Sequence, residues 1–188
     1  MTSVKRVFLD NSGKIISSVE GDAQVVALNT PSNAIFVDNI NYQQDSDYWD
    51  FDLFQFVPLG SAPSQYHVFN YTTKEWYDPR TLDELKTEKW TELKRQRDMF
   101  EFGGFTWNGG TYDSNRTSQS RIIMASLSDA PQTWTLADNS AVDLTAAELT
   151  QLAAALREHI AIAHARGRSA RAALEAATSA DEVNSVVF

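Results

Sequence analysis

The 188-residue chain contains no cysteine, which excludes a disulfide framework, a thiol nucleophile and a zinc site built from thiolates. Long apolar runs are also missing. After Lys5 and Arg6 only residues 7–9 are apolar before Asp10, which is too short for a secretory signal peptide, and no later segment approaches the length of a membrane span. We therefore expect a protein that is made and folded in a cytoplasm and has no membrane partner.

Positive charge is scarce. The chain has 16 lysines and arginines against 25 aspartates and glutamates, which gives a formal net charge of -9. Binding to phosphate backbones needs concentrated positive charge, so this balance argues against a nucleic-acid partner. The hydrophobic fraction of 43% is enough to bury a core, either in one domain of ordinary size or in two small ones.

The sequence has few of the motifs that carry catalysis. No serine stands in a Gly-x-Ser-x-Gly elbow, and the glycine pairs at 103–104 and 109–110 read as turns rather than as phosphate-binding loops. A pair of carboxylates for glycoside cleavage depends on tertiary geometry and leaves no sequence signature. We predict that the chain is not an enzyme and has no catalytic residue, cofactor-binding residue or cofactor.

Metal binding has two candidate residue sets. His159 and His164 are five positions apart, so they project in different directions from a helix, and His67 reads as a strand residue; no zinc site is predicted. Acidic residues are dense between Asp45 and Asp52, and such oxygens could hold calcium. However, no glycine lies within this loop and no glutamate closes it, which favours a solvated acidic face; calcium stays the alternative.

The first half of the chain is predicted to be rich in β-structure. Alternating and β-branched residues separated by turn residues indicate several short strands. In particular, Trp49, Phe51 and Leu53 alternate with aspartates, the period expected of a half-buried strand. The expected strands are residues 4–9, 15–19, 24–28, 34–37, 49–53, 66–70 and 74–77.

A helix and a tight hairpin are predicted to follow. Pro79 stops the last strand, and Thr81 with Glu84 forms a capping box, so a helix begins at Leu82. The glycines at 103–104 end this helix, and Asn108-Gly109 predicts a type I′ turn, which needs positive φ at both positions. The apolar face of the helix consists of Leu82, Leu85, Leu93 and Phe100, with Trp90 at its edge.

The second half is predicted to be mainly helical. Ser114 caps a helix over residues 116–127, and a small hairpin joins residues 134–136 to 141–143. Thr145 and Glu148 form a second capping box before an alanine-rich helix that ends near Gly167. A shorter helix over 170–177 and a final turn capped by Ser179 follow. The apolar face of the long helix consists of Leu149, Leu152, Leu156, Ile160 and Ala163.

These elements predict an α+β protein in three parts. The parts are a β-rich N-terminal domain over 1–78, a pivot helix over 79–101 and a helical C-terminal domain with two small hairpins over 102–188.

Tryptophan, tyrosine and phenylalanine make up 11% of the chain, and those of the first half could stack on sugars or fill a core. Arginines 157, 166, 168 and 171 read either as a docking stripe or as charges that favour a helix C-terminus.

Part of the sequence resembles bacteriophage proteins. The run from Phe69 to Leu82 is similar to a segment common in tail-fibre-associated proteins of tailed bacteriophages, and the residues after it resemble a C-terminal phage domain of unknown function. The resemblance covers residues 78–183 well and the first half loosely. Its matching motifs are Arg97-Asp98, Gly104-Phe105-Thr106-Trp107-Asn108-Gly109, Tyr112-Asp113-Ser114, Ser118-Gln119-Ser120-Arg121-Ile122 and Trp134-Thr135-Leu136-Ala137-Asp138-Asn139.

The resemblance implies a non-enzymatic structural or adaptor component of a phage tail, in the tail-fibre or baseplate region of the virion. Its partners would be other tail or fibre proteins and further copies of itself, with a trimer preferred, because tail components repeat by symmetry. Two alternatives stay open. One is a tail-fibre assembly chaperone that leaves before the virion is complete, and the other is a module that binds host surface glycans through its N-terminal aromatic residues.

Overall fold

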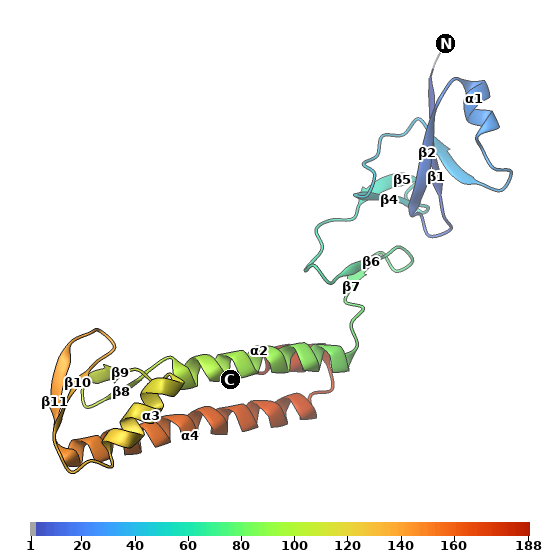
Figure 1. Cartoon of the computed structure of the whole chain (residues 1–188). Coiled ribbons are helices and arrows are strands. Elements are labelled where there is room, and N and C mark those ends of the chain that lie inside the picture. The colour runs from blue at the N-terminus through green and yellow to red at the C-terminus, as the bar shows by residue number, and fades with distance from the viewer. Residues whose placement is uncertain (1–2) are drawn as a thin grey trace. The chain divides into compact units, whose positions relative to one another are not determined.

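The computed structural model describes residues 3–188 and confirms an α+β protein (Figure 1). The chain divides into two compact units, Met1–Arg80 and Thr81–Phe188, which we call the N-terminal unit and the C-terminal unit. The sequence predicted a separate pivot helix between two domains. In the structure that helix lies within the C-terminal unit, because it packs along the longest helix of that unit.

The N-terminal unit is built from short antiparallel strands. Its three-stranded sheet has the order β2-β1-β3, and two separate hairpins, β4–β5 and β6–β7, follow it along the chain. The elements are β1 Val4–Leu9, β2 Ile15–Gly21, α1 Ala23–Leu28, β3 Ile35–Asp38, β4 Asp47–Asp50, β5 Gln55–Pro58, β6 Val68–Asn70 and β7 Glu75–Tyr77.

A small apolar core joins the three-stranded sheet to the β4–β5 hairpin. Val7 and Leu9 of β1 are buried together with Trp49 of β4. The turn between β1 and β2 lies directly against this core, because the backbone N–H of Trp49 donates to the carbonyl of Gly13 at 2.8 Å. Gly13 has a φ of +86°, and a Cβ there would lie 2.0 Å from the carbonyl oxygen of Trp49. Only glycine fits this close approach.

Two strand predictions for the N-terminal unit are wrong. Residues 24–28 belong to the helix α1, which begins because the Asp22 carboxylate accepts hydrogen bonds from the N–H groups of Gln24 and Val25. The strand expected over 49–53 ends at Asp50, whose carboxylate accepts from the N–H groups of Asp52 and Leu53. This local turn chemistry outweighs the period-two pattern, and Leu53 is left exposed.

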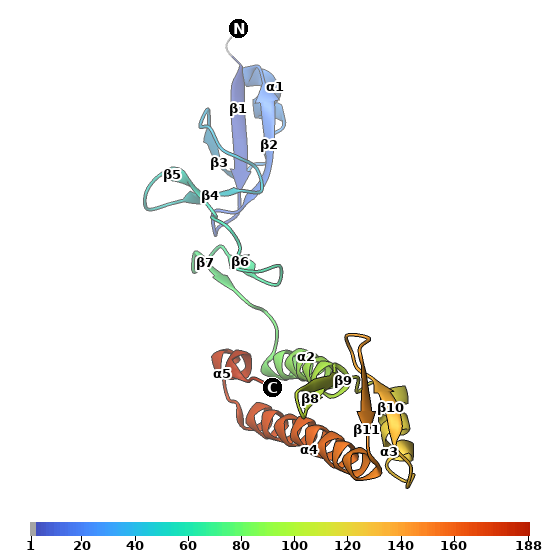
Figure 2. The same cartoon turned by 90° about the vertical axis from the view of Figure 1, so that its left-hand side faces the viewer.

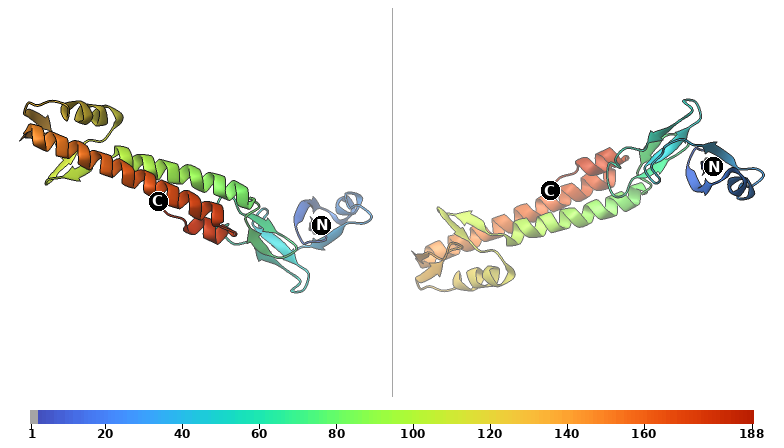
Figure 3. Two further views of the ribbon diagram at one scale, coloured as in Figure 1. Left: turned by 90° about the horizontal axis from the view of Figure 1, so that it is seen from below. Right: turned by 90° about the horizontal axis from the view of Figure 1, so that it is seen from above.

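The C-terminal unit is organised around two long helices, α2 and α4, which lie side by side in both views of Figure 3. They run antiparallel, since Arg97 of α2 meets Gly167 of α4 and Trp90 meets Arg171. The short helix α5 lies beside the last turns of α4 and contacts α2 as well (Figure 2). The elements are α2 Leu82–Phe102, β8 Phe105–Trp107, β9 Gly110–Tyr112, α3 Arg116–Ala125, β10 Gln132–Thr135, β11 Ala141–Leu144, α4 Ala146–Ala176 and α5 Ala180–Ser185.

The two halves of α4 are buried in two separate apolar clusters. Its first half packs against α3 and the strands β8, β9 and β11, in a cluster of Phe105, Tyr112, Ile122, Ala125, Leu144, Leu149, Leu152, Ala153 and Leu156. Its second half packs against α2 and α5, in a cluster of Leu85, Leu93, Ala170, Leu174, Ala177, Val183 and Val186. The first cluster uses the apolar face predicted for α4 and the second uses the face predicted for α2, whereas Ala170 and Leu174 lie beyond the predicted end of the long helix.

The two predicted capping boxes, at the starts of α2 and α4, are confirmed. Thr81 and Glu84 form a reciprocal capping box at α2, and Thr145 and Glu148 form one at α4. At α4, hydrogen bonds from the N–H and the hydroxyl of Thr145 hold the pKa of the Glu148 carboxyl below its ordinary value. The Asn108-Gly109 turn is confirmed as well, with φ of 47° and 79° between β8 and β9.

Replacing Thr81 by alanine is expected to lower the free energy of unfolding of the C-terminal unit by about 1 kcal/mol, because the first turn of α2 loses its cap. Chemical denaturation followed by circular dichroism measures this change. Thr91→Ala is the control, since Thr91 is exposed within the same helix and is not a cap. Equal stability of the two variants would contradict a stabilising cap at Thr81.

The cap expected at Ser114 is wrong. Asn115 is the N-cap of α3, and its side chain accepts from the N–H groups of Thr117 and Ser118. Ser114 is instead fully buried, where its hydroxyl donates to the carbonyl of Glu101 and accepts from the N–H of Gly104. Ser114 therefore ties the end of α2 to the segment that follows β9.

The helix end expected at Gly167 is also wrong, because α4 continues without a break to Ala176. The apolar stripe carries on past Ala163 through Gly167, Ala170 and Leu174, all of which are buried. Gly167 lies where α4 crosses α2, and a Cβ at this position would lie 3.3 Å from Cδ of Arg97. This glycine therefore serves a close helix–helix contact and is not a stop signal.

Candidate functional site: the groove between α2 and α4

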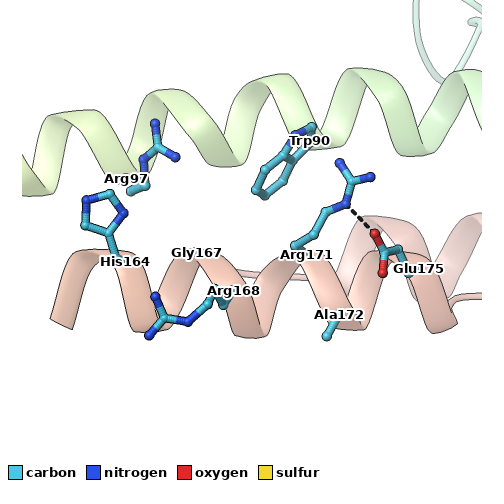
Figure 4. Close-up of a pocket in the computed structure, with 8 residues that line it drawn as sticks. All are labelled: Trp90, Arg97, His164, Gly167, Arg168, Arg171, Ala172 and Glu175. Atoms are coloured by element: carbon cyan, nitrogen blue, oxygen red, sulfur yellow. Dashed lines mark hydrogen bonds and ion pairs between the residues drawn. The ribbon is translucent and has the colours of Figure 1, made fainter. Parts of the chain in front are cut away.

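A groove of about 340 Å³ opens to solvent between α2 and α4 (Figure 4). A smaller hollow of about 150 Å³ extends it toward the start of α2, and the two share Trp90, Arg171 and Glu175. We call the two together the α2–α4 groove. Its lining residues are Lys86, Thr87, Trp90, Arg97, His164, Gly167, Arg168, Arg171, Ala172, Leu174 and Glu175.

The length of the groove follows from the positions of its lining residues on α2. Lys86 lies at one end and Arg97 at the other, eleven positions apart. At the α-helical rise this separation corresponds to about 17 Å, or three helical turns. The groove is therefore longer than a site for a single small ion needs.

Trp90 forms an apolar surface in the middle of the groove. The guanidinium of Arg171 lies over its ring at 5.1 Å from the centroid, and the Nε of Arg171 donates to Glu175 at 2.6 Å (Figure 4). A cation over an indole ring is held by the negative face of the ring. This contact and the ion pair hold Arg171 across the gap between the two helices.

Gly167 and Arg97 lie together at the end of the groove farthest from Lys86. Because Gly167 has no side chain, the aliphatic part of Arg97 lies close to the α4 backbone. The guanidinium of Arg97 pairs with Asp98 at 2.7 Å, and half of the Asp98 side chain is exposed. His164 lies beside Arg97, and its Nε2 is 3.5 Å from a carboxylate oxygen of Glu101 (Figure 4).

Arg168 forms no ion pair with a carboxylate among residues 3–188. It is exposed, and Figure 4 shows its guanidinium pointing away from α2, toward solvent. An uncompensated guanidinium offers a bidentate donor pair for a carboxylate.

The charge of the groove is opposite to that of the unit around it. Its lining includes Lys86, Arg97, Arg168 and Arg171 but a single carboxylate, Glu175. The C-terminal unit has 11 lysines and arginines against 15 aspartates and glutamates, a net charge of -4. Residues 159–174 of α4 include three arginines and no acidic residue. Positive charge is thus gathered on an otherwise acidic unit.

The sequence predicted part of this site. Two arginines of the suggested docking stripe, Arg168 and Arg171, line the groove. Arg166 lies over the Phe100 ring at 4.7 Å instead, and Arg157 does not line the groove. The alternative interpretation, charges at a helix C-terminus, does not apply to Arg166 and Arg168, because α4 ends only at Ala176.

The structure does not bring the other candidate ligands together. His159 stacks on Phe100 and its Nε2 lies 3.0 Å from the carbonyl oxygen of that residue, while His67 is hydrogen-bonded to Ser64. Within the acidic segment 45–52, the carboxylate of Asp47 accepts from the N–H of Gln43. In the described part of the chain, no group of three or more histidines and carboxylates is arranged to hold a metal ion.

The aromatic residues of the N-terminal unit divide into buried and exposed ones. Tyr48 and Phe69 are buried with their ring centroids 5.4 Å apart, and Trp76 packs edge-on against Phe69. These side chains form part of a core. The exposed side chains, which are open to an outside ligand, are Tyr66 and Tyr77 together with Phe36, Phe51 and Phe54.

A second open groove, of about 590 Å³, lies between α3 and β10. The side chain of Met124 lines it and is 67% exposed, and Leu127, just after α3, is 75% exposed. Large exposed apolar side chains near a groove are typical of protein-binding surfaces. These two open surfaces of the C-terminal unit therefore differ in chemistry.

No helix of the described residues is both long and apolar enough to cross a lipid bilayer.

No curated protein and no solved structure matches the chain. Residues 84–187, which include the whole α2–α4 groove and more than half of the chain, match the family described as Domain of unknown function (DUF4376). On this match, the chain belongs to the DUF4376 family.

Proposed function

We propose that the chain is a non-enzymatic structural or adaptor component of a bacteriophage tail, in the tail-fibre or baseplate region, and that it acts through protein–protein interfaces. The sequence resemblance to tail-fibre-associated proteins motivates the phage assignment. The observation that carries the mode of action is the α2–α4 groove, where cations and a half-buried indole ring line an open surface on an acidic unit. Arginine and tryptophan are the residues most enriched at the centres of protein interfaces.

In this proposal the chain works as a compact homo-oligomer, with a trimer preferred, or in a stable complex with another tail protein. Tail components repeat around a symmetry axis and bury equivalent surfaces on neighbouring copies. Static light scattering on the purified chain is expected to give a mass of about three times 21.0 kDa. A monomer at high protein concentration would contradict the homo-oligomer and leave only the complex with a different tail protein.

Deleting the gene from a phage that encodes this chain tests the proposed function. We expect particles whose tails lack part of the fibre or baseplate region in electron micrographs, with normal heads. Supplying the chain from a plasmid during infection should restore the tails. Complete tails and full infectivity in the deletion strain would contradict a structural or adaptor role.

A further inference from the structure

We propose that the α2–α4 groove binds an acidic amphipathic helix of a partner protein. This inference rests on the proposed function, because it names the chemistry of the partner that the adaptor would hold. Three properties of the groove point to this occupant: its length, its apolar middle and its charge.

The length and walls of the groove fit a helix. Two antiparallel helices leave a long furrow between them, and a third helix that lies in this furrow completes a small bundle. The distance from Lys86 to Arg97 along α2 matches about three turns of such a helix. Helix-in-groove recognition places residues spaced three and four apart into the groove.

The middle of the groove accepts apolar side chains, because the half-buried Trp90 ring and the exposed Ala172 line it. A leucine on the incoming helix would cover the exposed part of the half-buried Trp90 ring. Burial of apolar area at this position supplies affinity, and the charges around it supply selectivity.

The charges select for carboxylates on the incoming helix. Arg168 has no carboxylate partner among the described residues, so it is free to bind one. The carboxylates that pair with Arg97 and Arg171 belong to Asp98 and Glu175, whose side chains are 51% and 64% exposed. Ion pairs this exposed are weak and are readily exchanged for a better-placed partner.

Three synthetic peptides of 15 residues provide the test. Each has leucines at helical spacing, and its remaining exposed positions are all glutamate, all glutamine or all lysine. Fluorescence anisotropy with the full chain is expected to show the glutamate peptide binding about tenfold more tightly than the glutamine peptide, with affinity that falls as salt rises. The lysine peptide should bind more weakly than the glutamine peptide. Equal affinities for the glutamate and glutamine peptides would overturn the proposal.

Matched variants on one helix locate the binding surface. Arg168→Glu is expected to weaken binding of the glutamate peptide by about tenfold. Arg157→Glu makes the same charge change on α4 outside the groove lining and should leave the affinity within about twofold of the original. Circular dichroism checks that both variants fold. Equal weakening by the two variants would show that the overall charge of the chain determines the affinity for the peptide. This result would overturn the assignment of the binding site to the groove.

A second copy of the chain is the competing occupant. If Arg168→Glu dissociates an oligomer seen by light scattering, and the glutamate peptide does not bind the intact oligomer of the unchanged chain, the groove is an interface between copies and the proposal of a partner helix fails. These outcomes do not depend on whether virions contain the chain. The inference and the proposed tail function can therefore fail separately.

Discussion

Gly13→Ala is expected to destabilise the N-terminal unit by about 3 kcal/mol or more, enough to unfold a unit this small at moderate temperature. Two causes add. Alanine at a φ of +86° is strained, and its Cβ would lie 2.0 Å from the carbonyl oxygen of Trp49. The β1–β2 turn must then move away from β4, which breaks the hydrogen bond between Trp49 and Gly13 and opens the core around Val7.

Gly60→Ala separates these two causes. Gly60 has a similar φ of +73°, but a Cβ there would meet no atom within 4 Å. We expect a loss of about 1 kcal/mol from backbone strain alone. Amide-resolved hydrogen exchange measures the stability of each unit in both variants. Similar losses at residues 13 and 60 would show that the contact with Trp49 does not constrain the fold.

Leu152→Ala is expected to lower the free energy of unfolding of the C-terminal unit by about 3 kcal/mol. Leu152 is completely buried in the first half of α4, within the cluster that joins this helix to α3 and to the hairpins. Its truncation leaves a cavity within this cluster that the surrounding helices and strands can close only in part. Urea unfolding followed by helical circular dichroism measures the change.

Leu127→Ala is the matched control, because it removes the same atoms from a side chain that is 75% exposed. Its effect on stability should be within about 0.5 kcal/mol. A loss of less than about 1 kcal/mol at Leu152 would contradict the core position of this residue. It would mean that the first cluster of α4 is loosely packed.

The sequence predicted the features that depend on a few neighbouring residues. The capping boxes at Thr81 and Thr145 and the turn at Asn108-Gly109 each need a specific residue type at a specific spacing, and the structure confirms all three. Apolar residues at the 3.6-residue period of a helix predicted the buried side of α2 and of the first half of α4 for the same reason. All the residues that make up such a signal lie within one segment of the chain.

The predictions failed where a local signal had two interpretations. Residues 24–28 are β-branched and apolar enough for a strand, yet the preceding Asp22 caps them into α1. Gly167 looks like a helix end, yet the apolar stripe continues through Ala170 and Leu174. Following that stripe past the glycine would have found the full length of α4 from the sequence alone.

The sequence predicted only the α4 residues of the candidate site. The arginines at 168 and 171 stand out on α4, but nothing in the sequence says that Trp90, Arg97 and Lys86 of α2 face them. That knowledge requires the antiparallel register of the two helices, which is set by tertiary contacts such as the one between Gly167 and Arg97. A charge pattern along one helix therefore indicates that this helix contributes to a binding surface. It does not identify the residues that the neighbouring helix contributes.

Quantitative mass spectrometry of purified, gradient-banded particles tests the central claim most directly. If the chain is a structural or adaptor component of the tail, its copy number per particle should be constant between preparations, a multiple of the tail symmetry, and unchanged by a high-salt wash. Absence of the chain from complete particles, although it is abundant in infected cells, would contradict the claim. That result would favour the alternative of a transient assembly chaperone.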